Sequence, residues 1–275
     1  MDADGQHECE TIFNAAKKLR NENLDLVLGS RFNKNSNLNG LSRNRTKGSS
    51  LANKIARFSL SKKYKNITDY MSGCIVLDQN KTVEFIKKVD INGYKFLYEL
   101  LAISKGKLNV REIPLNFKPR TYGQSKLDIP VIWDFVLSVI HSLMFRIIPR
   151  RAISFGFVGS SGVIVQLLST SILMSSMKFP FEKAIIFGAL IAASSNYLIN
   201  NMLTFRSFKL KNFQLLKGLM KFLIVSSLPI IANVGLATTY YNNISKSTFW
   251  AQIAGIIVVF IWNYAASSRF VWNTP

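Results

Sequence analysis

The sequence predicts two domains of different class, an α/β domain followed by an all-α domain of four membrane-spanning helices. Short strand-like and helix-like segments alternate in the first half, and four long runs without charge occupy the second half. The composition agrees, because 48% of the residues are hydrophobic and the formal net charge is +20. A nucleic-acid-binding domain is rarely so apolar, whereas a membrane protein with basic cytoplasmic loops has both properties.

The first half reads as alternating helices and strands. Helices are predicted for TIFNAAKKL, for the end of LSRNRTKGSSLANKIARFSL, and for VEFIKKV and YKFLYELLAIS, and strands for LDLVLGS, GCIVLD and LNVREIPLNF. The helical segments carry apolar residues at helical spacing, and LDLVLGS ends in Gly-Ser. Such alternation favours a sheet whose strands are joined by crossover helices.

The second half contains runs long enough to cross a bilayer as helices. They cover residues 152–177, 184–205, 222–245 and 247–268. Buried helices of a soluble domain are the alternative. From Arg151 onward there are ten basic residues and one acidic residue, and the loop 206–221 carries five of the basic ones. By the positive-inside rule, this loop and both termini are expected in the cytoplasm.

The second half also repeats a short pattern. SNYLINNMLTF ends the second run and WNYAASSRFVW ends the fourth. In each, an Asn-Tyr pair is followed by an aromatic residue nine positions after the Asn: Phe205 after Asn196, and Trp272 after Asn263. Two related helical hairpins would produce this pattern; a coincidence between aromatic-rich helix ends is the alternative.

A segment between the halves is apolar but interrupted by charge. It reads IPVIWDFVLSVIHSLMFRIIPRR and contains Asp134, His141 and Arg146. The pattern predicts one or two helices in the membrane interface. A linker packed on the soluble domain is the alternative.

The first residues carry a pattern that suits a metal–phosphate site. Asp2 and Asp4 stand one residue apart, and Gln6 adds an oxygen two residues later. Carboxylate and amide oxygens can hold Mg²⁺ or Mn²⁺ while phosphates fill the other coordination positions. The Asp-x-Asp pattern alone is common by chance, so the rest of the sequence has to support it.

Basic residues follow in two groups that suit phosphate recognition. Arg31 comes directly after a predicted strand, and Arg45 precedes Ser49 by one helical turn. Further on, RTYGQSKL offers Arg120, Ser125 and Lys126 around a glycine. Forked guanidinium donors bind phosphate oxygens well. Any one of these residues, taken alone, could equally be a solvated surface charge.

Five ordered motifs resemble one enzyme family. MDADGQHECE, GSR, DYMSG, GYKFLYELL and VREIPLNFKPRTYGQSKL are similar to family 2 glycosyltransferases of the dolichol-phosphate (polyprenyl-phosphate) mannosyltransferase type, which have the GT-A fold. Residues 151–275 are similar to the GtrA-like four-helix membrane domains. The resemblance implies a GT-A part over 1–127, interfacial helices over 128–150 and a membrane domain from 151 onward, with helices near 153–175, 184–205, 222–244 and 248–268.

The resemblance also implies roles for the site residues. Asp2, Asp4 and Gln6 would hold the metal on the donor's diphosphate, and Arg31, Arg45, Ser49 and Arg120 would grip the lipid phosphate with Lys126 nearby. Asp4, Arg31 and Arg120 are thus the implied catalytic residues, while Asp69, Ser72, Gly73 and Ser125 would lie near the acceptor.

The implied substrates are a nucleotide sugar and a polyprenyl or dolichyl phosphate, with no nucleic acid as a partner. Mannose from GDP-mannose is the first expectation, and glucose from UDP-glucose is the alternative. A catalytically inactive membrane protein that acts in translocation of lipid-linked sugars is the competing function.

One departure from the family bears on activity. Family members carry roughly 80–90 residues before the DAD motif, and these bind the nucleotide; here the motif begins at Asp2. The expectation is therefore a truncated member with no detectable transferase activity, whose upstream-extended form is active and metal-dependent.

Overall fold

The computed structural model describes residues 6–36, 43–89, 95–116, 129–243 and 248–274. The predicted site residues Asp2, Asp4, Arg120, Ser125 and Lys126 lie outside the described residues. The chain divides into two compact units, Met1–Ile147 and Ile148–Pro275, and each is described by itself.

The first unit contains the alternating helices and strands that the sequence predicts. In chain order they are α1 (Cys9–Asn21), β1 (Leu26–Ser30), α2 (Arg43–Ser59), β2 (Ile75–Leu77), α3 (Gln79–Ile86), α4 (Phe96–Ser104), β3 (Val110–Pro114) and α5 (Ile129–Leu143). A short 3₁₀ turn, Lys62–Tyr64, follows α2. Asp78 caps α3, because its carboxylate accepts hydrogen bonds from the backbone N–H groups of Asn80 and Lys81.

The three strands form one mixed sheet in the order β2-β1-β3. β1 pairs in parallel with β3, with Leu26 opposite Val110 and Ser30 opposite Pro114. β2 pairs antiparallel with β1. The predicted crossover connection between parallel strands therefore applies only to β1 and β3. The structure therefore has a small α/β unit, and the carboxyl ends of β1 and β3 share one edge.

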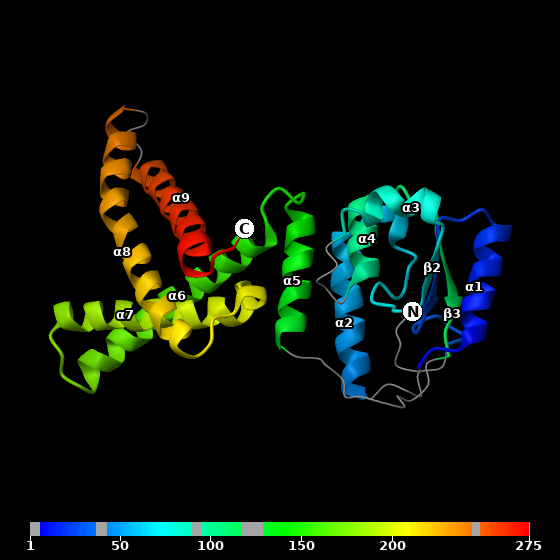
Figure 1. Cartoon of the computed structure of the whole chain (residues 1–275), viewed down its shortest axis with the longest axis horizontal. Helices are drawn as coiled ribbons and strands as arrows, with labels where there is room; N and C mark the ends of the chain where they lie inside the picture. The colour runs from blue at the N-terminus through cyan, green and yellow to red at the C-terminus, as the bar shows by residue number, and fades with distance from the viewer. Residues whose placement is uncertain (1–5, 37–42, 90–94, 117–128, 244–247, 275) are drawn as a thin grey trace. The chain divides into compact units, whose positions relative to one another are not determined.

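The central strand lies between α1 on one side and α2 and α4 on the other (Figure 1). Its side chains alternate, as those of a strand do: Val27 packs with Ala15 of α1 on one face. Leu26 and Leu28 point to the other face and join the larger core, which includes Ala56 of α2 and Leu100 of α4. Every residue of β1 is buried, so this strand is the core of the unit.

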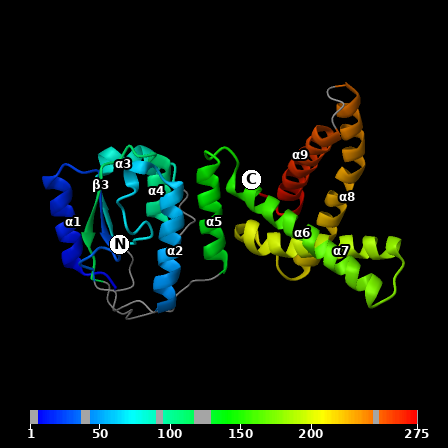
Figure 2. The same ribbon diagram turned by 180° about the vertical axis from the view of Figure 1, so that it is seen from behind.

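Helix α5 packs on the first unit along one side. Its Phe135 and Val139 are buried in the same core as Ala56 and Leu101, and the views from front and back both show α5 beside α2 (Figures 1 and 2). The segment after it is tied down as well, because Arg146 forms a 2.6 Å ion pair with the buried Glu99. The buried side of α5 thus agrees with the alternative that this segment packs on the first domain. That α5 also lies in a membrane interface stays a prediction.

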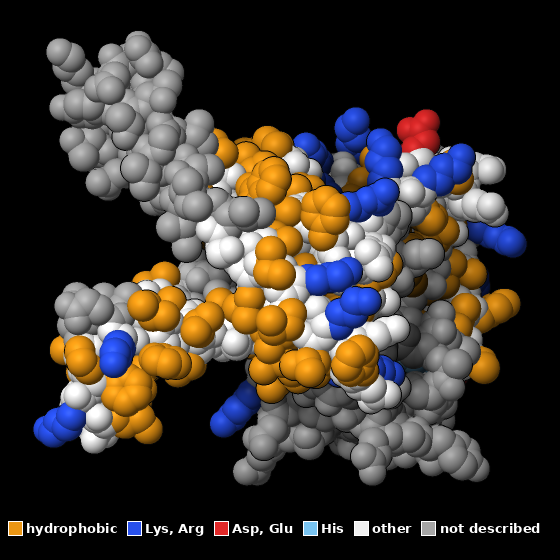
Figure 3. Space-filling view, turned by 60° about the vertical axis from the view of Figure 1, so that its left-hand side comes forward, with side chains coloured by type: hydrophobic (Ala, Val, Ile, Leu, Met, Phe, Trp, Pro, Cys, Tyr) orange, Lys and Arg blue, Asp and Glu red, His pale blue; other side chains and the backbone are white. Residues whose placement is uncertain are grey.

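The second unit consists of long helices. They are α6 (Arg150–Ser175), α7 (Phe181–Ile199), α8 (Asn212–Asn243) and α9 (Thr248–Ala266). Each of the four charge-free runs overlaps one of these helices. In the described part of the chain, α6 alone is both long and apolar enough to meet the criterion for a membrane-crossing helix. On the face shown in Figure 3, apolar side chains cover much of the surface and basic side chains outnumber acidic ones.

The repeated sequence pattern has a structural counterpart. Both α7 and α9 end in a π-helical turn, Asn200–Thr204 after α7 and Ser267–Val271 after α9. Each turn lies at the same distance from its Asn-Tyr pair and is followed by the aromatic residue, Phe205 or Trp272. π-Turns are rare, so the matching pair supports two related helical hairpins.

Candidate functional site

The candidate site is built on the carboxyl edge of the parallel strand pair. β1 ends at Ser30, and Arg31 is the next residue. β3 ends beside it at Pro114 and leads to Asn116, the last described residue before the segment that contains Arg120. Ligand sites of open α/β sheets lie at the carboxyl ends of strands. Two of the predicted phosphate-binding residues, Arg31 and Arg120, follow β1 and β3 in the sequence at such ends.

Arg31 is held in place by Asp69. Its Nε donates to Oδ2 of Asp69 over 2.7 Å, and its Nη2 donates to Oδ1 over 2.9 Å. The backbone N–H of Arg31 also donates to Oδ2, over 3.2 Å. The Asp69 side chain is fully buried, and that of Arg31 is 12% exposed. Bidentate pairs of this kind fix the plane of a guanidinium, so Asp69 orients Arg31.

A second carboxylate holds the loop that carries Asp69. Glu112 of β3 accepts hydrogen bonds from the backbone N–H of Thr68, over 2.7 Å, and from its hydroxyl, over 2.9 Å. The hydroxyl groups of Thr68 and Ser30 lie 2.6 Å apart. Burial raises the pKa of Glu112, although the bonds from Thr68 oppose the shift. The loop is thereby joined to both parallel strands.

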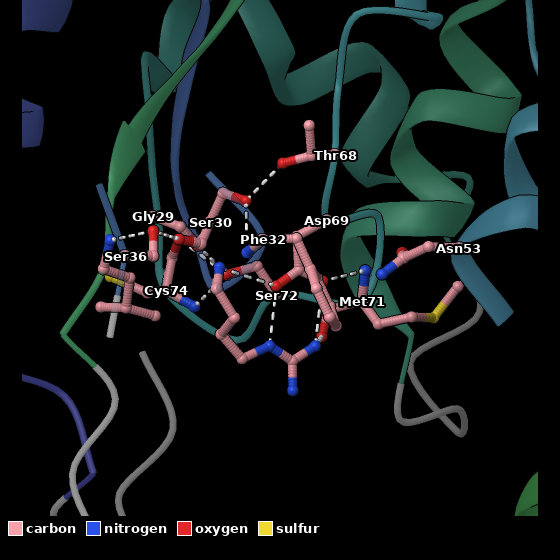
Figure 4. Close-up of polar contacts among 12 residues, drawn as sticks. Gly29, Ser30, Phe32, Ser36, Asn53, Thr68, Asp69, Met71, Ser72 and Cys74 are labelled. Atoms are coloured by element: carbon pink, nitrogen blue, oxygen red, sulfur yellow. Dashed lines mark hydrogen bonds and ion pairs between the residues drawn. The ribbon is translucent and has the colours of Figure 1, made fainter. Parts of the chain in front are cut away.

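The remainder of this loop is fixed by Ser72 (Figure 4). The Ser72 hydroxyl donates to the carbonyl of Gly29 over 2.5 Å, and it accepts from the backbone N–H of Cys74 over 3.1 Å. The Asp69 carboxylate accepts from the backbone N–H of Met71. Asp69 and Ser72 were predicted to lie near the acceptor. In the structure, Ser72 bonds to Gly29 of β1 and Asp69 bonds to Arg31, the residue after β1. Gly73, next to Ser72 in the chain, is half-buried.

Helix α2 is tied to the same loop. Asn53, which is 5% exposed, accepts a 2.8 Å hydrogen bond from the backbone N–H of Tyr70. Ser49 precedes Asn53 by one helical turn, and Arg45 precedes Ser49 by another, so all three positions share one side of α2. Ser49 is half-buried, and the side chain of Arg45 lies outside the described ones.

A pocket connects three segments that the sequence assigns to the site. Its volume is about 360 Å³, and its lining includes Glu8, Asn35 and Asn116. The Asn116 side-chain amide donates to the Glu8 carboxylate over 3.4 Å. Glu8 stands four residues after Asp4, Asn35 four after Arg31, and Asn116 four before Arg120. Glu8 and Asn116, the described residues near Asp4 and Arg120 in sequence, thus line the same pocket.

The metal prediction is only partly within the described structure. Gln6 is fully buried. The described residues contain no group of three or more His, Cys, Asp or Glu side chains suited to a metal, but the two carboxylates of the predicted site are not among them.

Sequence reasoning missed the residues that support the site. Glu112, Thr68 and Asn53 hold the Asp69 loop to the sheet and to α2. Their partners are 17 to 44 residues away in the chain, and no local pattern marks Thr68 or Asn53. The polar Glu112 inside an otherwise strand-like run, VREI, was the available signal.

The chain is similar to known proteins over both of its units. Residues 154–272 match the GtrA/DPMS transmembrane domain family. The chain is also 27% identical to a dolichol-phosphate mannosyltransferase of Pyrococcus furiosus over 279 aligned residues, which cover 100% of this chain and 75% of that relative. The chain is therefore dolichol-phosphate mannosyltransferase-like and carries a GtrA-type transmembrane domain. The similarity to that relative spans both units, and the transmembrane-domain match lies within the second unit.

Proposed function

We propose that this protein is a membrane-bound glycosyltransferase that moves a hexose from a nucleotide sugar to a polyprenyl phosphate on the cytoplasmic face. The observation that carries the proposal is that Glu8, Asn35 and Asn116 line one pocket at the end of β3. The similarity of the whole chain to a dolichol-phosphate mannosyltransferase supports the same reaction. GDP-mannose is the proposed donor, and UDP-glucose is the alternative.

The chemistry needs few proton transfers. An oxygen of the lipid phosphate forms a bond to the anomeric carbon, while the bond from that carbon to the nucleotide diphosphate breaks. A phosphate ester is largely ionised near neutral pH, because its second pKa is about 6, so the acceptor attacks with little help from a base. What the protein has to supply is positive charge for two phosphate groups.

The residues of this chain fit that demand. Arg31, oriented by Asp69, takes one side of the acceptor phosphate, and Arg45 and Ser49 of α2 take the other. Arg120 and Lys126 complete the clamp from the segment after Asn116. Asp2, Asp4 and Gln6 offer the hard oxygen ligands that Mg²⁺ or Mn²⁺ prefers, and a bound ion would neutralise the leaving diphosphate.

The membrane domain keeps the enzyme at its lipid substrate. We propose that α6, α7, α8 and α9 all cross the bilayer and that both termini lie in the cytoplasm. The excess of Lys and Arg around residues 206–221 supports this orientation. The acceptor phosphate would then meet the first unit at the cytoplasmic surface.

The test is transfer of radiolabelled sugar from GDP-mannose or UDP-glucose into the organic phase of vesicles that contain polyprenyl phosphate. It is run on the 275-residue chain and on any in-frame upstream extension that its gene encodes. Arg120→Lys is expected to lower transfer about ten- to a hundredfold, the cost of one charged hydrogen bond. Arg111→Lys, at an exposed position of β3, is the matched control. Absence of transfer by every form with either donor, or an equal effect of both substitutions, would contradict the proposal.

A further inference from the structure

The repeated pattern of the second unit carries buried polar atoms at equivalent positions. Within the described part of this unit, four buried side-chain atoms have no hydrogen-bond partner, and all four are oxygens. They belong to Asn196, Asn200, Asn263 and Ser267. Asn196 and Asn263 are the asparagines of the two Asn-Tyr pairs, and the other two residues follow them by four positions. The oxygens therefore form two matching pairs, each with its members one helical turn apart.

Both pairs stand at the same point of a π-turn. Asn200 and Ser267 are the first residues of the two turns. Their backbone carbonyls close the turns by accepting from the N–H of Phe205, over 2.8 Å, and from the N–H of Trp272, over 3.2 Å. The backbone is thus satisfied at this point, and the side-chain oxygen beside it is the atom that lacks a partner in the described part of the chain. A group bound in each repeat would explain why the arrangement recurs.

The chemistry of the four oxygens selects a neutral ligand that donates hydrogen bonds. Three of them are amide oxygens, which only accept. An anion, which also only accepts, cannot satisfy them. Oxygens can bind a cation, but the nearby charges oppose one, because Arg206 follows the first π-turn and Arg269 lies within the second. The ligand that remains carries hydrogen to donate and no charge.

Burial limits the size of that ligand. Asn200 is 1% exposed and Ser267 is 0% exposed. Asn196 lies against Gly162 of α6, where even an added Cβ atom would overlap its side chain. A sugar or a lipid headgroup is too large to reach such positions, whereas a water molecule is small and offers two hydrogens. Buried waters bridge polar groups that are otherwise unsatisfied, and they also compensate irregular turns in membrane helices.

We propose that each repeat holds one buried water molecule beside its π-turn. In the first hairpin the water donates one hydrogen to Asn196 and the other to Asn200. In the second hairpin it bridges Asn263 and Ser267. Each water then links the last turn of a long helix to the start of the π-turn that follows it. This inference goes beyond the proposed transferase function and does not depend on it.

The test is detection of bound water by NMR in the full, isotope-labelled chain in nanodiscs. Magnetisation transfer from water identifies protein protons that lie beside a long-lived water molecule. We expect cross peaks from water to the side-chain amides of Asn200 and Asn263. The matched control is Asn201, which is 2% exposed but already bonded to Leu210 through both its amide nitrogen and its oxygen; its side-chain amide should show no such peak.

Three results of this measurement would overturn the proposal. The first is the absence of both expected peaks, and the second is a peak in one repeat only. The third is an equal peak at Asn201, because the signal would then not depend on the unpaired oxygens. Replacing choline chloride by sodium chloride at constant ionic strength should leave the side-chain shifts of Asn200 and Asn263 unchanged. Shifts that follow the sodium concentration would mean that the occupant is a cation, which also contradicts the proposal.

The substitution Ser267→Ala gives a second readout with an informative sign. Removing a buried hydroxyl that has no partner should raise the melting temperature, because such a group costs stability. Removing one that binds water should lower it by about 2–4 °C, and should weaken the water peak at Asn263 but not at Asn200. Ser160→Ala, at an exposed position of α6, is the control for helix propensity. A melting temperature of Ser267→Ala at or above that of Ser160→Ala would refute the bound water.

Discussion

The phenyl ring of Phe205 stacks on the indole of Trp272, with ring centroids 4.1 Å apart and planes inclined by 11°. Both residues are almost fully buried. The ring of Tyr197 also stacks on the indole of Trp272, with ring centroids 5.5 Å apart. Phe205 and Trp272 occupy matching positions after the two π-turns. The two hairpins of the second unit are therefore joined at equivalent points of their repeated pattern.

Removal of the indole should destabilise the membrane domain. Trp272 also donates its Nε1–H to the Asn201 side chain over 3.0 Å, and Asn201 in turn accepts from the backbone N–H of Leu210. Trp272→Ala should lower the free energy of unfolding by about 3–5 kcal/mol. Trp272→Phe keeps the stacking and loses one hydrogen bond, at about 1 kcal/mol. Thermal melts in detergent measure both. Trp262, which is 48% exposed, is the control position. If Trp262→Ala lowers the free energy of unfolding as much as Trp272→Ala, the aromatic stack does not contribute specifically to stability.

Two glycines of α6 should respond differently to the same substitution. A Cβ on Gly162 would overlap the Asn196 side chain of α7, whereas a Cβ on Gly159 has nothing within 4 Å. Small residues let membrane helices approach closely. Gly162→Ala should therefore loosen the α6–α7 hairpin and lower its melting temperature, and Gly159→Ala should leave it unchanged or raise it slightly through helix propensity. Equal melting temperatures for the two variants would count against close packing at Gly162.

The Arg31–Asp69 pair should be sensitive to loss of either charge. Asp69→Asn leaves the guanidinium of Arg31 largely buried without its carboxylate, and breaking a buried pair costs about 3–5 kcal/mol of folding stability. The matched control is Glu22→Gln, which removes the partner of Lys18 in an exposed pair of 3.7 Å. That change should cost less than about 1 kcal/mol. Melting curves of the purified chain compare the two, and a loss of similar size in both would refute a structural role for Asp69.

Lys95 should make stability depend on alkaline pH. Its Nζ donates to the Val131 carbonyl over 2.9 Å and lies 4.2 Å from the centroid of the Phe135 ring. Burial lowers the pKa of Lys95 from 10.5 to about 8, although Asp134 and Glu99 oppose the shift. The unfolded chain then binds more protons between these values, so the contribution of Lys95 to stability rises from pH 8 to 10.5.

Lys95→Met removes this titration. The melting temperature of the wild type minus that of the variant should increase as the pH is raised from 8 to 10. A difference that stays constant across this range would mean that Lys95 titrates normally. The comparison between the two proteins cancels the titration of the other lysines and tyrosines.

The proposed topology can be tested from outside intact cells. A cysteine at Lys209, in the basic loop before α8, should resist a membrane-impermeant thiol reagent. A cysteine at Lys178, between α6 and α7, should react. Both cysteines should react with the reagent in lysed cells, which shows that each one is accessible once the membrane is open. The opposite pattern in intact cells would invert the orientation.

Much of the first unit could be read from the sequence because its signals are local. The helical spacing in TIFNAAKKL and the compact apolar run LDLVLGS predicted α1 and β1. The direction of β2 could not be predicted, because alternation of elements is compatible with parallel and antiparallel neighbours. The 128–150 segment shows a related difficulty: an apolar side suits a membrane surface and a protein core equally well, and Phe135 of α5 is in the core.

Only part of the candidate site could be predicted from the sequence. Arg31 and Asp69 were both selected from motifs, but their direct pairing across 38 residues was not foreseen. Arg31 was expected to bind the lipid phosphate and Asp69 to lie near the acceptor, and in the structure Asp69 is the partner that orients Arg31. Such assignments depend on which loops the sheet brings together, and that is set by the pairing of β1 with β3 rather than by any nearby residue.

The sheet also imposes an order on biosynthesis. β1 can pair with β2 once residue 77 has been made, but its other edge waits for β3, whose Pro114 lies opposite Ser30. At about 5–20 residues per second, the 84 residues between these partners take roughly 4–17 seconds to translate. During that interval β1 has an edge of unpaired backbone N–H and C=O groups, and the ribosome has not yet delivered α6 to the membrane. Recruitment of a chaperone to the nascent chain would be most useful in this window, before the first unit can close.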